Sequence, residues 1–257
     1  MRTLLKGGEP FYFQGGPVGC VLVHGFTGAP EEMLWLGEYL ADRGSSVLGV
    51  RLFGHGTQPE DMLRARWEDW IASVEDGYYL LQESCEQIIV LGLSLGGALS
   101  LYVASQLPLT GVVAMSTPFV TPDARVSKLR PILPLISTVW RFAQKDPSSD
   151  WRDAETADTH LSYNVQPVRA AVELDDLLGE MRARLPQIRV PALLIHSRQD
   201  GAVPPEHAQQ IFDQLQVRDK ELLWLENSGH VVTRDAAREQ VFHAAAQFIS
   251  RVTEPGA

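Results

Sequence analysis

The chain has 257 residues, of which 45% are hydrophobic and 21% charged, which is enough apolar sequence for a large core in a single globular domain. Its formal net charge of −10 at pH 7 argues against binding to nucleic acids or anionic membranes through a basic patch, because the long-range field repels both. No apolar run is long enough for a signal peptide or a membrane span. We therefore expect a cytoplasmic protein without stable membrane insertion, whose partners are neutral or small molecules and not nucleic acids.

The first part of the chain alternates between short apolar runs and helical patterns. A β-rich segment at 9–14 stops at Gly15-Gly16-Pro17 and predicts a short edge strand. The apolar run 20–23 predicts a buried parallel strand that ends at the loop 24–28. The alternation then continues with elements expected at 31–43 (helix), 46–52 (strand), 67–81 (helix) and 88–91 (strand).

The same alternation returns near the end of the chain. Further elements are expected at 95–106 (helix), 111–115 (strand), 192–196 (strand), 221–225 (strand) and 235–250 (helix). Strands that alternate with helices predict an α/β fold with a mostly parallel, doubly wound sheet.

The alternation fails between Thr117 and residue 188, a stretch too long for an ordinary connection. We predict that residues 118–188 form an inserted cap of two or three small helices within the single domain 1–257, one of them from the helical pattern at 173–185. An insertion at this edge of an α/β sheet lies where such sheets bind ligands. The apolar run 129–142 is expected to line an acyl pocket, with Leu133, Ile136 and Trp140 as substrate-binding residues. Transient contact with a lipid surface, or ordinary core packing, is the alternative for this run.

One stretch has the pattern of a catalytic serine. Ser94 follows an apolar run, has glycines two residues away on each side, and precedes a helical pattern. Such glycines let neighbouring segments approach closely around a strained strand-to-helix turn. The pattern predicts a nucleophile elbow at Ser94.

Serine at neutral pH needs a neighbouring base, and that base needs an acceptor that fixes its tautomer. Asp200 follows the strand expected at 192–196, and His230 follows the one expected at 221–225, so both lie on the edge that carries Ser94. The order Ser, Asp, His is that of α/β-hydrolases. We predict Ser94 as nucleophile, His230 as base and Asp200 as the orienting acid, with Asp123 as the alternative acid.

Backbone amides are expected to complete the site, because a tetrahedral oxyanion needs donors. The Leu95 amide lies at a helix N-terminus, whose dipole favours negative charge, and the Phe26 amide lies in the loop after the first buried strand. His24 and His55 are expected to stabilise their loops by hydrogen bonds, and His196 to be a core residue. The cysteines lack metal-site spacing, so we expect neither a metal nor an organic cofactor.

Five motifs together resemble a known family: His24-Gly25-Phe26-Thr27-Gly28, Gly54-His55-Gly56, Gly92-Leu93-Ser94-Leu95-Gly96-Gly97, Asp200 with Val203-Pro204, and Ser228-Gly229-His230-Val231. With them the chain resembles the bacterial thermostable carboxylesterase and monoacylglycerol lipase family of α/β-hydrolases, over nearly its whole length except the cap. The resemblance implies hydrolysis of carboxylic esters, with monoacylglycerols and short to medium acyl esters as substrates. It also implies the same roles for Ser94, Asp200, His230 and the two amides.

The function predicted from the sequence is therefore a serine esterase that acts through an acyl-enzyme on Ser94. Two alternatives stay open. One is another chemistry on the same fold, such as a thioesterase, peroxidase or C–C hydrolase. The other is a ligand receptor without catalytic activity, although such a protein is expected to have lost a triad residue and none is missing here.

Overall fold

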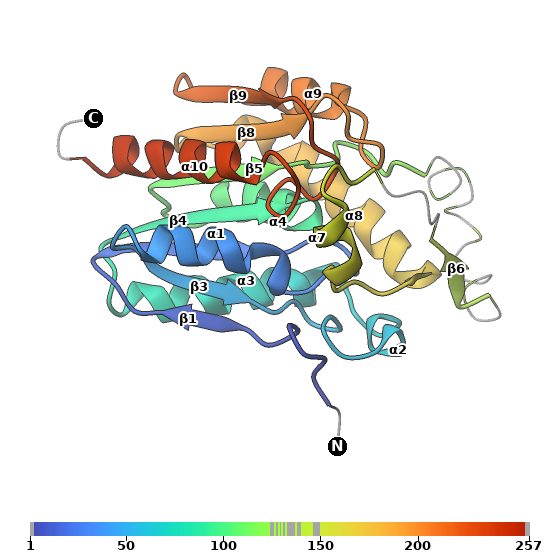
Figure 1. Ribbon diagram of the computed structural model, residues 1–257. Coiled ribbons are helices and arrows are strands. Elements are labelled where there is room, and N and C mark those ends of the chain that lie inside the picture. The colour runs from blue at the N-terminus through green and yellow to red at the C-terminus, as the bar shows by residue number, and fades with distance from the viewer. Residues whose placement is uncertain are drawn as a thin grey trace.

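The computed structural model describes residues 3–123, 126, 128, 130, 132, 137, 140–145 and 150–254. Its main sheet has seven strands in the order β1-β3-β2-β4-β5-β8-β9 (Figure 1). All neighbouring strands pair in parallel except β1, which pairs antiparallel with β3 at one edge. The strands are β1 (Phe11–Phe13), β2 (Val18–Val23), β3 (Ser46–Val50), β4 (Gln87–Leu93), β5 (Gly111–Met115), β8 (Ala192–Ser197) and β9 (Lys220–Leu225).

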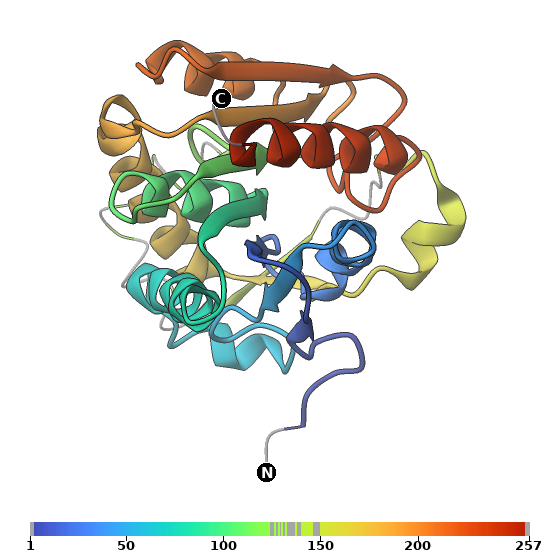
Figure 2. The ribbon, with the colours of Figure 1, turned by 90° about the vertical axis from the view of Figure 1, so that its left-hand side faces the viewer.

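Helices cover both faces of this sheet. Helices α1 (Glu31–Ala41) and α10 (Arg238–Thr253) share one hydrophobic cluster with one face, while α3 (Trp67–Gln82), α4 (Leu95–Ala104) and α8 (Val168–Arg184) share another cluster with the opposite face. Figure 2 shows α1 and α10 on one side of the strands and α3 and α4 on the other. The short elements α2 (Pro59–Met62), η1 (Leu185–Gln187) and α9 (Glu206–Gln214) complete the described part of this domain.

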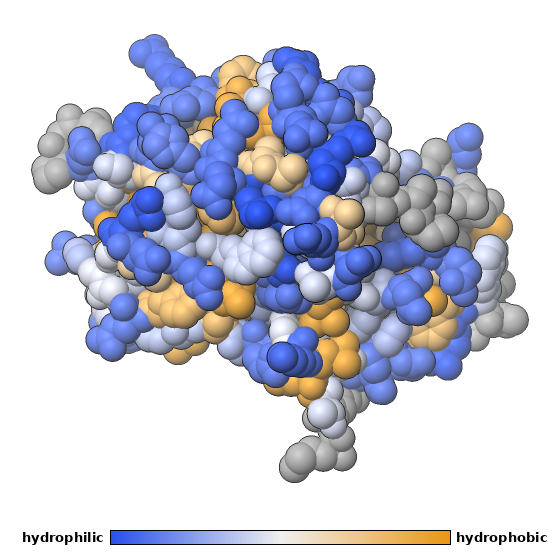
Figure 3. All heavy atoms as spheres, viewed as in Figure 1, coloured by the Kyte–Doolittle hydropathy of each residue, from blue (hydrophilic) through white to orange (hydrophobic). Residues whose placement is uncertain are grey.

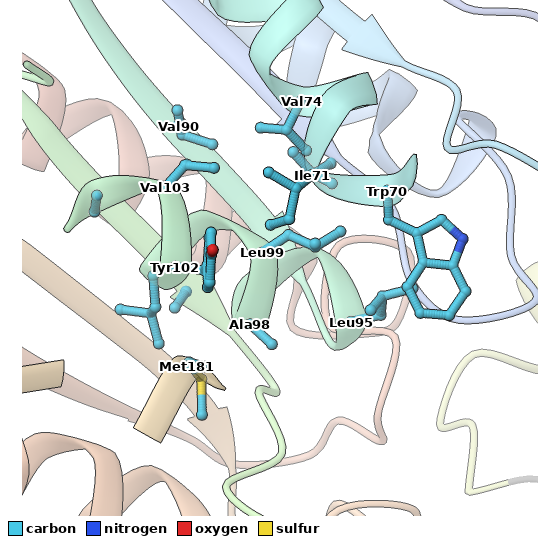
Figure 4. Packing of buried hydrophobic residues seen from close by; sticks show 14 of the residues in the cluster. Trp70, Ile71, Val74, Val90, Leu95, Ala98, Leu99, Tyr102, Val103 and Met181 are labelled. Atoms are coloured by element: carbon cyan, nitrogen blue, oxygen red, sulfur yellow. The ribbon is translucent and has the colours of Figure 1, made fainter. Parts of the chain in front are cut away.

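Helix α4 lies at the centre of the larger cluster because it has no polar face. Every one of its residues is buried, as expected of a helix that is apolar all round. Its side chains pack against Ile71 and Val74 of α3 on one flank and Met181 of α8 on the other (Figure 4). Packing on both flanks fixes the N-terminus of α4, and Ser94 is the residue directly before it.

The predicted main-domain elements are confirmed, with ends that differ by a few residues. The prediction for residues 173–185 was wrong in its placement. This helical pattern belongs to α8, whose buried residues Leu177, Leu178 and Met181 join the core cluster against α4 instead of lying in a cap. α8 is therefore the crossover helix between the parallel strands β5 and β8, and its apolar stripe is buried against α4 and α3.

The rest of the insertion includes α7 (Ala154–Thr159) and a two-stranded antiparallel sheet of β6 (Phe142–Gln144) and β7 (Val165–Pro167). Tyr163 anchors it to the domain. Its amide donates to the Thr27 carbonyl at 2.9 Å, and its hydroxyl donates to the Gly54 carbonyl at 3.0 Å. The insertion therefore rests on the loops that follow β2 and β3.

The face that carries α1 and α10 is largely hydrophilic, with hydrophobic residues in small groups (Figure 3). This distribution agrees with the strongly negative net charge. Among the residues that the structure describes, no helix combines the length and the apolar sequence needed to cross a bilayer.

Candidate active site

Ser94 occupies a strained turn between β4 and α4. Its φ of 56° and ψ of −114° are values that side-chain-bearing residues rarely adopt. The turn closes because glycines flank it: a Cβ at Gly92 would lie 2.0 Å from the Gly96 carbonyl oxygen, and one at Gly96 would lie 2.1 Å from the Val23 carbonyl oxygen. The backbone thus has the geometry predicted for a nucleophile elbow.

The structure brings His230 and Asp200 into contact. Asp200 follows β8, His230 follows β9, and the His230 Nδ1 lies 2.8 Å from the Asp200 Oδ2. Because a carboxylate can only accept, Nδ1 carries the proton and the Nε2 of neutral His230 keeps a lone pair. His230 and Ser94 line the same two hollows at the carboxyl ends of the strands.

The Asp200 carboxylate is held by several donors. Its Oδ1 accepts the amides of Ala202 at 2.9 Å and Val203 at 2.8 Å, and its Oδ2 also lies 3.3 Å from the His196 Nε2. Burial opposes the charge, but the neighbouring His230 and His196 outweigh it and lower the pKa of Asp200. Asp200 therefore stays ionised.

The same pair shifts His230 in the opposite direction. Burial alone lowers the pKa of the imidazole, but the charge of Asp200 and its hydrogen bond outweigh that effect and raise the pKa of His230 above 6.5. A base of this kind takes up a proton readily near neutral pH.

Two backbone amides lie close to Ser94: that of Leu95, the next residue, and that of Phe26, which lines both hollows together with Ser94. The Leu95 N–H is the first of α4, and the first N–H groups of a helix have no intrahelical acceptor. The Phe26 N–H has no hydrogen-bond acceptor in the part of the chain that the structure describes. Both are thus available as donors to a developing oxyanion.

Two hollows meet at Ser94, and both are lined by Phe26, Lys145 and His230 as well. The one with more charged side chains in its lining is called the polar hollow and the other the apolar hollow. The apolar hollow, of about 280 Å³, is further lined by Pro118, Thr121, Pro122, Asp123, Val126, Gln166, Ala171, Leu174, Ala202 and Val203. The polar hollow, of about 150 Å³, is further lined by Gly25, Glu32, Leu93, Asp150, His160, Ser162, Ala202 and Val231. A ligand at Ser94 can therefore place an apolar part on one side and a hydrogen-bonding part on the other.

Comparison with known proteins places the chain in a family. The family described as serine aminopeptidase, S33, matches residues 18–237. The chain belongs to this family of α/β-hydrolases. The fold and the resemblance predicted from the motifs are thereby confirmed.

This hydrolase is 37% identical to a thermostable monoacylglycerol lipase of Bacillus sp. (strain H-257) over 255 residues, which cover 96% of each chain. It is 32% identical to a carboxylesterase of Bacillus subtilis (strain 168), over 95% of this chain and 97% of the other. A solved structure from work on LipS and LipT, two metagenome-derived lipolytic enzymes, has a TM-score of 0.90 at 33% identity, with 97% of this chain and 100% of that chain covered.

The other predicted residues have varied outcomes. Leu133 and Ile136 lie outside the described residues. Trp140 does not fit its predicted role, because it is 61% exposed and lines neither hollow. Solvent, not the site, surrounds this side chain. The alternative acid Asp123 lines the apolar hollow.

The histidines outside the predicted catalytic set have the expected roles. His24 Nε2 accepts the Leu52 amide at 3.2 Å, and its Nδ1 lies 2.9 Å from the Gly25 carbonyl. His55 Nδ1 lies 3.1 Å from the Phe53 carbonyl, and burial together with the proximity of His24 lowers its pKa to about 3, while burial also lowers the pKa of His24. Both rings therefore stabilise loops as neutral groups. His196 is buried in β8, as predicted.

Sequence reasoning missed the polar residues that line the site outside the predicted triad. Asp150 accepts the amides of Gly201 and His230 through its Oδ2, at 2.9 Å each, and so ties the insertion to both loops of the acid–base pair. Glu32 and His160 form a second link. Of these three residues, only Glu32 could have been noticed in the sequence, because it is a charged residue on the apolar stripe of a helix.

Proposed function

We propose that this hydrolase cleaves carboxylic esters by nucleophilic catalysis at Ser94. Ser94 Oγ attacks the ester carbonyl while His230 Nε2 takes its proton, and Asp200 orients the imidazole and stabilises its cation. The Phe26 and Leu95 amides bind the oxyanion of the tetrahedral intermediate. His230 then protonates the leaving alcohol, and in the second half it activates the water that releases the acid from the acyl-enzyme.

The observation that carries this proposal is the meeting of four groups at one point. Ser94 in its strained turn, the His230–Asp200 pair at 2.8 Å and two amide donors follow four different strands and converge on one edge of the sheet. Each group is one that acyl transfer requires. The naming of two relatives as a monoacylglycerol lipase and a carboxylesterase supports esters as the substrate class.

The two hollows support an assignment of the substrate's halves. The acyl chain occupies the apolar hollow, where Val126, Leu174 and Val203 remove it from water. The leaving alcohol occupies the polar hollow, where Lys145 and Ser162 can donate to its hydroxyls and Asp150 can accept from them. Monoacylglycerols with short to medium acyl chains match this division, because their glycerol part keeps two free hydroxyls.

A fluorophosphonate probe and an ester series test the reaction. We expect a covalent adduct on Ser94 in the wild type, none in Ser94→Ala, and turnover of p-nitrophenyl esters and monoacylglycerols but little of acyl-thioesters or amino-acid p-nitroanilides. Near-normal esterase activity in Ser94→Ala would refute the proposal. Thioester or anilide turnover above every ester would assign another acyl transfer to the same site.

One variant tests where the acyl chain binds. Ala171 lines the apolar hollow from α8, so Ala171→Phe fills it and is expected to shift the preferred acyl length to shorter chains. Ala183 lies on the same helix but is exposed, so Ala183→Phe is the matched control and should leave the profile unchanged. An unchanged profile in Ala171→Phe would place the acyl chain elsewhere.

A further inference from the structure

A buried carboxylate outside the acid–base pair lies against the loop that carries Phe26. Glu32, in the first turn of α1, is only 4% exposed. Its Oε2 accepts the Gly25 amide at 2.7 Å, and its Oε1 lies 2.7 Å from the His160 Nε2. Burial disfavours its charge, but the hydrogen bond and charge of His160 outweigh burial and lower the pKa of Glu32 to about 2.

This carboxylate completes the hydrogen bonding of Gly25. The Gly25 carbonyl already accepts from the Gly28 amide at 3.2 Å and lies 2.9 Å from the His24 Nδ1. With Glu32 on its amide, both polar groups of Gly25 are held. Because the peptide bond is planar and trans, fixing the Gly25 carbonyl also fixes the opposite direction of the Phe26 N–H.

The second oxygen of Glu32 reaches the insertion. His160 directly follows α7, and its ring lies 5.0 Å from the Trp151 ring. The Glu32 main-chain oxygen also accepts from the Thr233 Oγ1 at 2.6 Å, in the loop that carries His230. Glu32 therefore contacts the Phe26 loop, the insertion and the loop of the base at once.

We propose that Glu32 is a positioning residue that orients the Phe26 amide toward the oxyanion, and that His160 couples this orientation to the position of the insertion. The proposal rests on the proposed function, because the oxyanion exists only if Ser94 forms a tetrahedral adduct. Glu32 touches no reacting atom. It acts through Gly25, so its loss should affect the transition state more than the binding of substrate.

The first experiment compares Glu32→Ala and Glu32→Gln by steady-state kinetics with p-nitrophenyl butyrate. We expect Glu32→Ala to lose about 10²-fold in kcat, the usual cost of one misplaced oxyanion donor, with KM little changed. Glu32→Gln keeps an acceptor for the Gly25 amide and should recover most of kcat. A purely structural role would instead reduce stability and the active fraction, so kcat per active site, counted by titration with the fluorophosphonate probe, would stay at the wild-type value.

The matched control is the neighbouring Glu31→Gln. Glu31 forms an ion pair with the buried Arg234 at 2.9 Å but does not contact the Gly25 amide. This variant should unfold more easily, because it leaves a buried cation without its charged partner, and yet keep the wild-type kcat. It separates loss of stability from loss of oxyanion geometry.

His160→Ala and His160→Gln test the link to the insertion, and they decide the proposal even if Glu32→Ala fails to fold. We expect His160→Ala to lower kcat by about tenfold, a smaller loss because the Gly25 bond stays, and His160→Gln to restore it through its amide nitrogen. Affinity for butaneboronic acid, which forms a tetrahedral adduct with serine, should fall in parallel with kcat.

Two results would overturn the proposal. One is a folded Glu32→Ala, or His160→Ala where the former does not fold, with kcat within threefold of wild type. The other is a loss of kcat with unchanged boronate affinity. Both require an active wild type, whereas failure of the proposed function appears as a wild type that hydrolyses no ester or a Ser94→Ala variant that still does.

Discussion

Replacement of Asp200 by Asn tests the acid–base pair most directly, because the substitution preserves shape and changes only hydrogen-bonding character. The side-chain oxygen of Asn can still accept the Ala202 and Val203 amides, as Oδ1 does now. The NH2 group then takes the place of Oδ2, where His230 and His196 both present ring nitrogens. The NH2 group, which can only donate, would therefore face the ring N–H donors of His230 and His196.

The predicted loss follows from the tautomer of His230. With an NH2 group opposite Nδ1, the imidazole is stable only with its proton on Nε2, so it has no lone pair to accept the Ser94 proton. A wrong tautomer in a triad of this kind costs about 10⁴-fold in kcat, which corresponds to about 5.5 kcal/mol at 1.36 kcal/mol for each factor of ten. KM should change little, because Asp200 lines neither hollow.

The assay is steady-state hydrolysis of p-nitrophenyl butyrate at pH 8, with Asp123→Asn as the matched control. Asp123 lies at the apolar hollow, so its variant is expected to alter KM and to keep kcat within about tenfold of wild type. If Asp200→Asn retained more than a tenth of wild-type kcat while Asp123→Asn lost several orders of magnitude, the acid would be Asp123 and the assignment made here would be wrong.

Three further predictions concern different parts of the molecule. The kcat/KM of the free enzyme should rise with pH, with its midpoint above pH 6.5, because Asp200 raises the pKa of His230 and only neutral His230 accepts a proton. A profile with its midpoint below pH 6.5 would contradict this. The interaction with Asp200 that raises this pKa also stabilises the folded state below pH 6.5, and this contribution is lost as the pH rises through the folded-state pKa of His230. Gly28→Ala should lower kcat in the manner of Glu32→Ala, because a Cβ there would lie 2.2 Å from Glu32 Oε1; wild-type kcat would show that the carboxylate can move without consequence. Met181→Ala should reduce the free energy of unfolding by about 2–5 kcal/mol in urea titrations and leave acyl-chain preference unchanged. Unchanged stability with an altered acyl-chain preference would show that α8 belongs to the cap.

The sequence predicts the main domain and its convergent residues because both depend on local patterns. Apolar runs followed by helical patterns predict parallel strands, and parallel strands end on one edge. Any residue directly after such a strand is thus placed near the others, which is why Ser94, Asp200 and His230 could be brought together without a structure.

Two features depend on pairing between distant segments and could not be predicted in this way. An amphipathic pattern shows that α8 has an apolar stripe but not what it packs against. Helix α4, which has no polar face, did need cover on both flanks, and α8 covers one of them. The contact between Glu32 and His160 joins residues 128 apart, with no local pattern to connect them.

The strain at Ser94 allows a prediction about stability that separates the backbone from the chemistry. A side-chain-bearing residue at φ 56° and ψ −114° costs about 1–3 kcal/mol, whereas glycine adopts this conformation freely at an entropic cost of about 0.5–1 kcal/mol. Ser94→Gly should therefore be about 1 kcal/mol more stable than Ser94→Ala, although both lack the hydroxyl.

Ser100, six residues along in α4, provides the matched pair with the opposite sign. It is fully buried and lies within a regular helix, so Ser100→Gly should be about 1 kcal/mol less stable than Ser100→Ala. Chemical denaturation of the four variants measures both differences. If glycine destabilised position 94 as it does position 100, the elbow would store no strain. If the signs differ, the fold holds Ser94 in an unfavourable conformation that stability alone would not select, and exposure of the proposed nucleophile beside the two amides is the physical reason for keeping it.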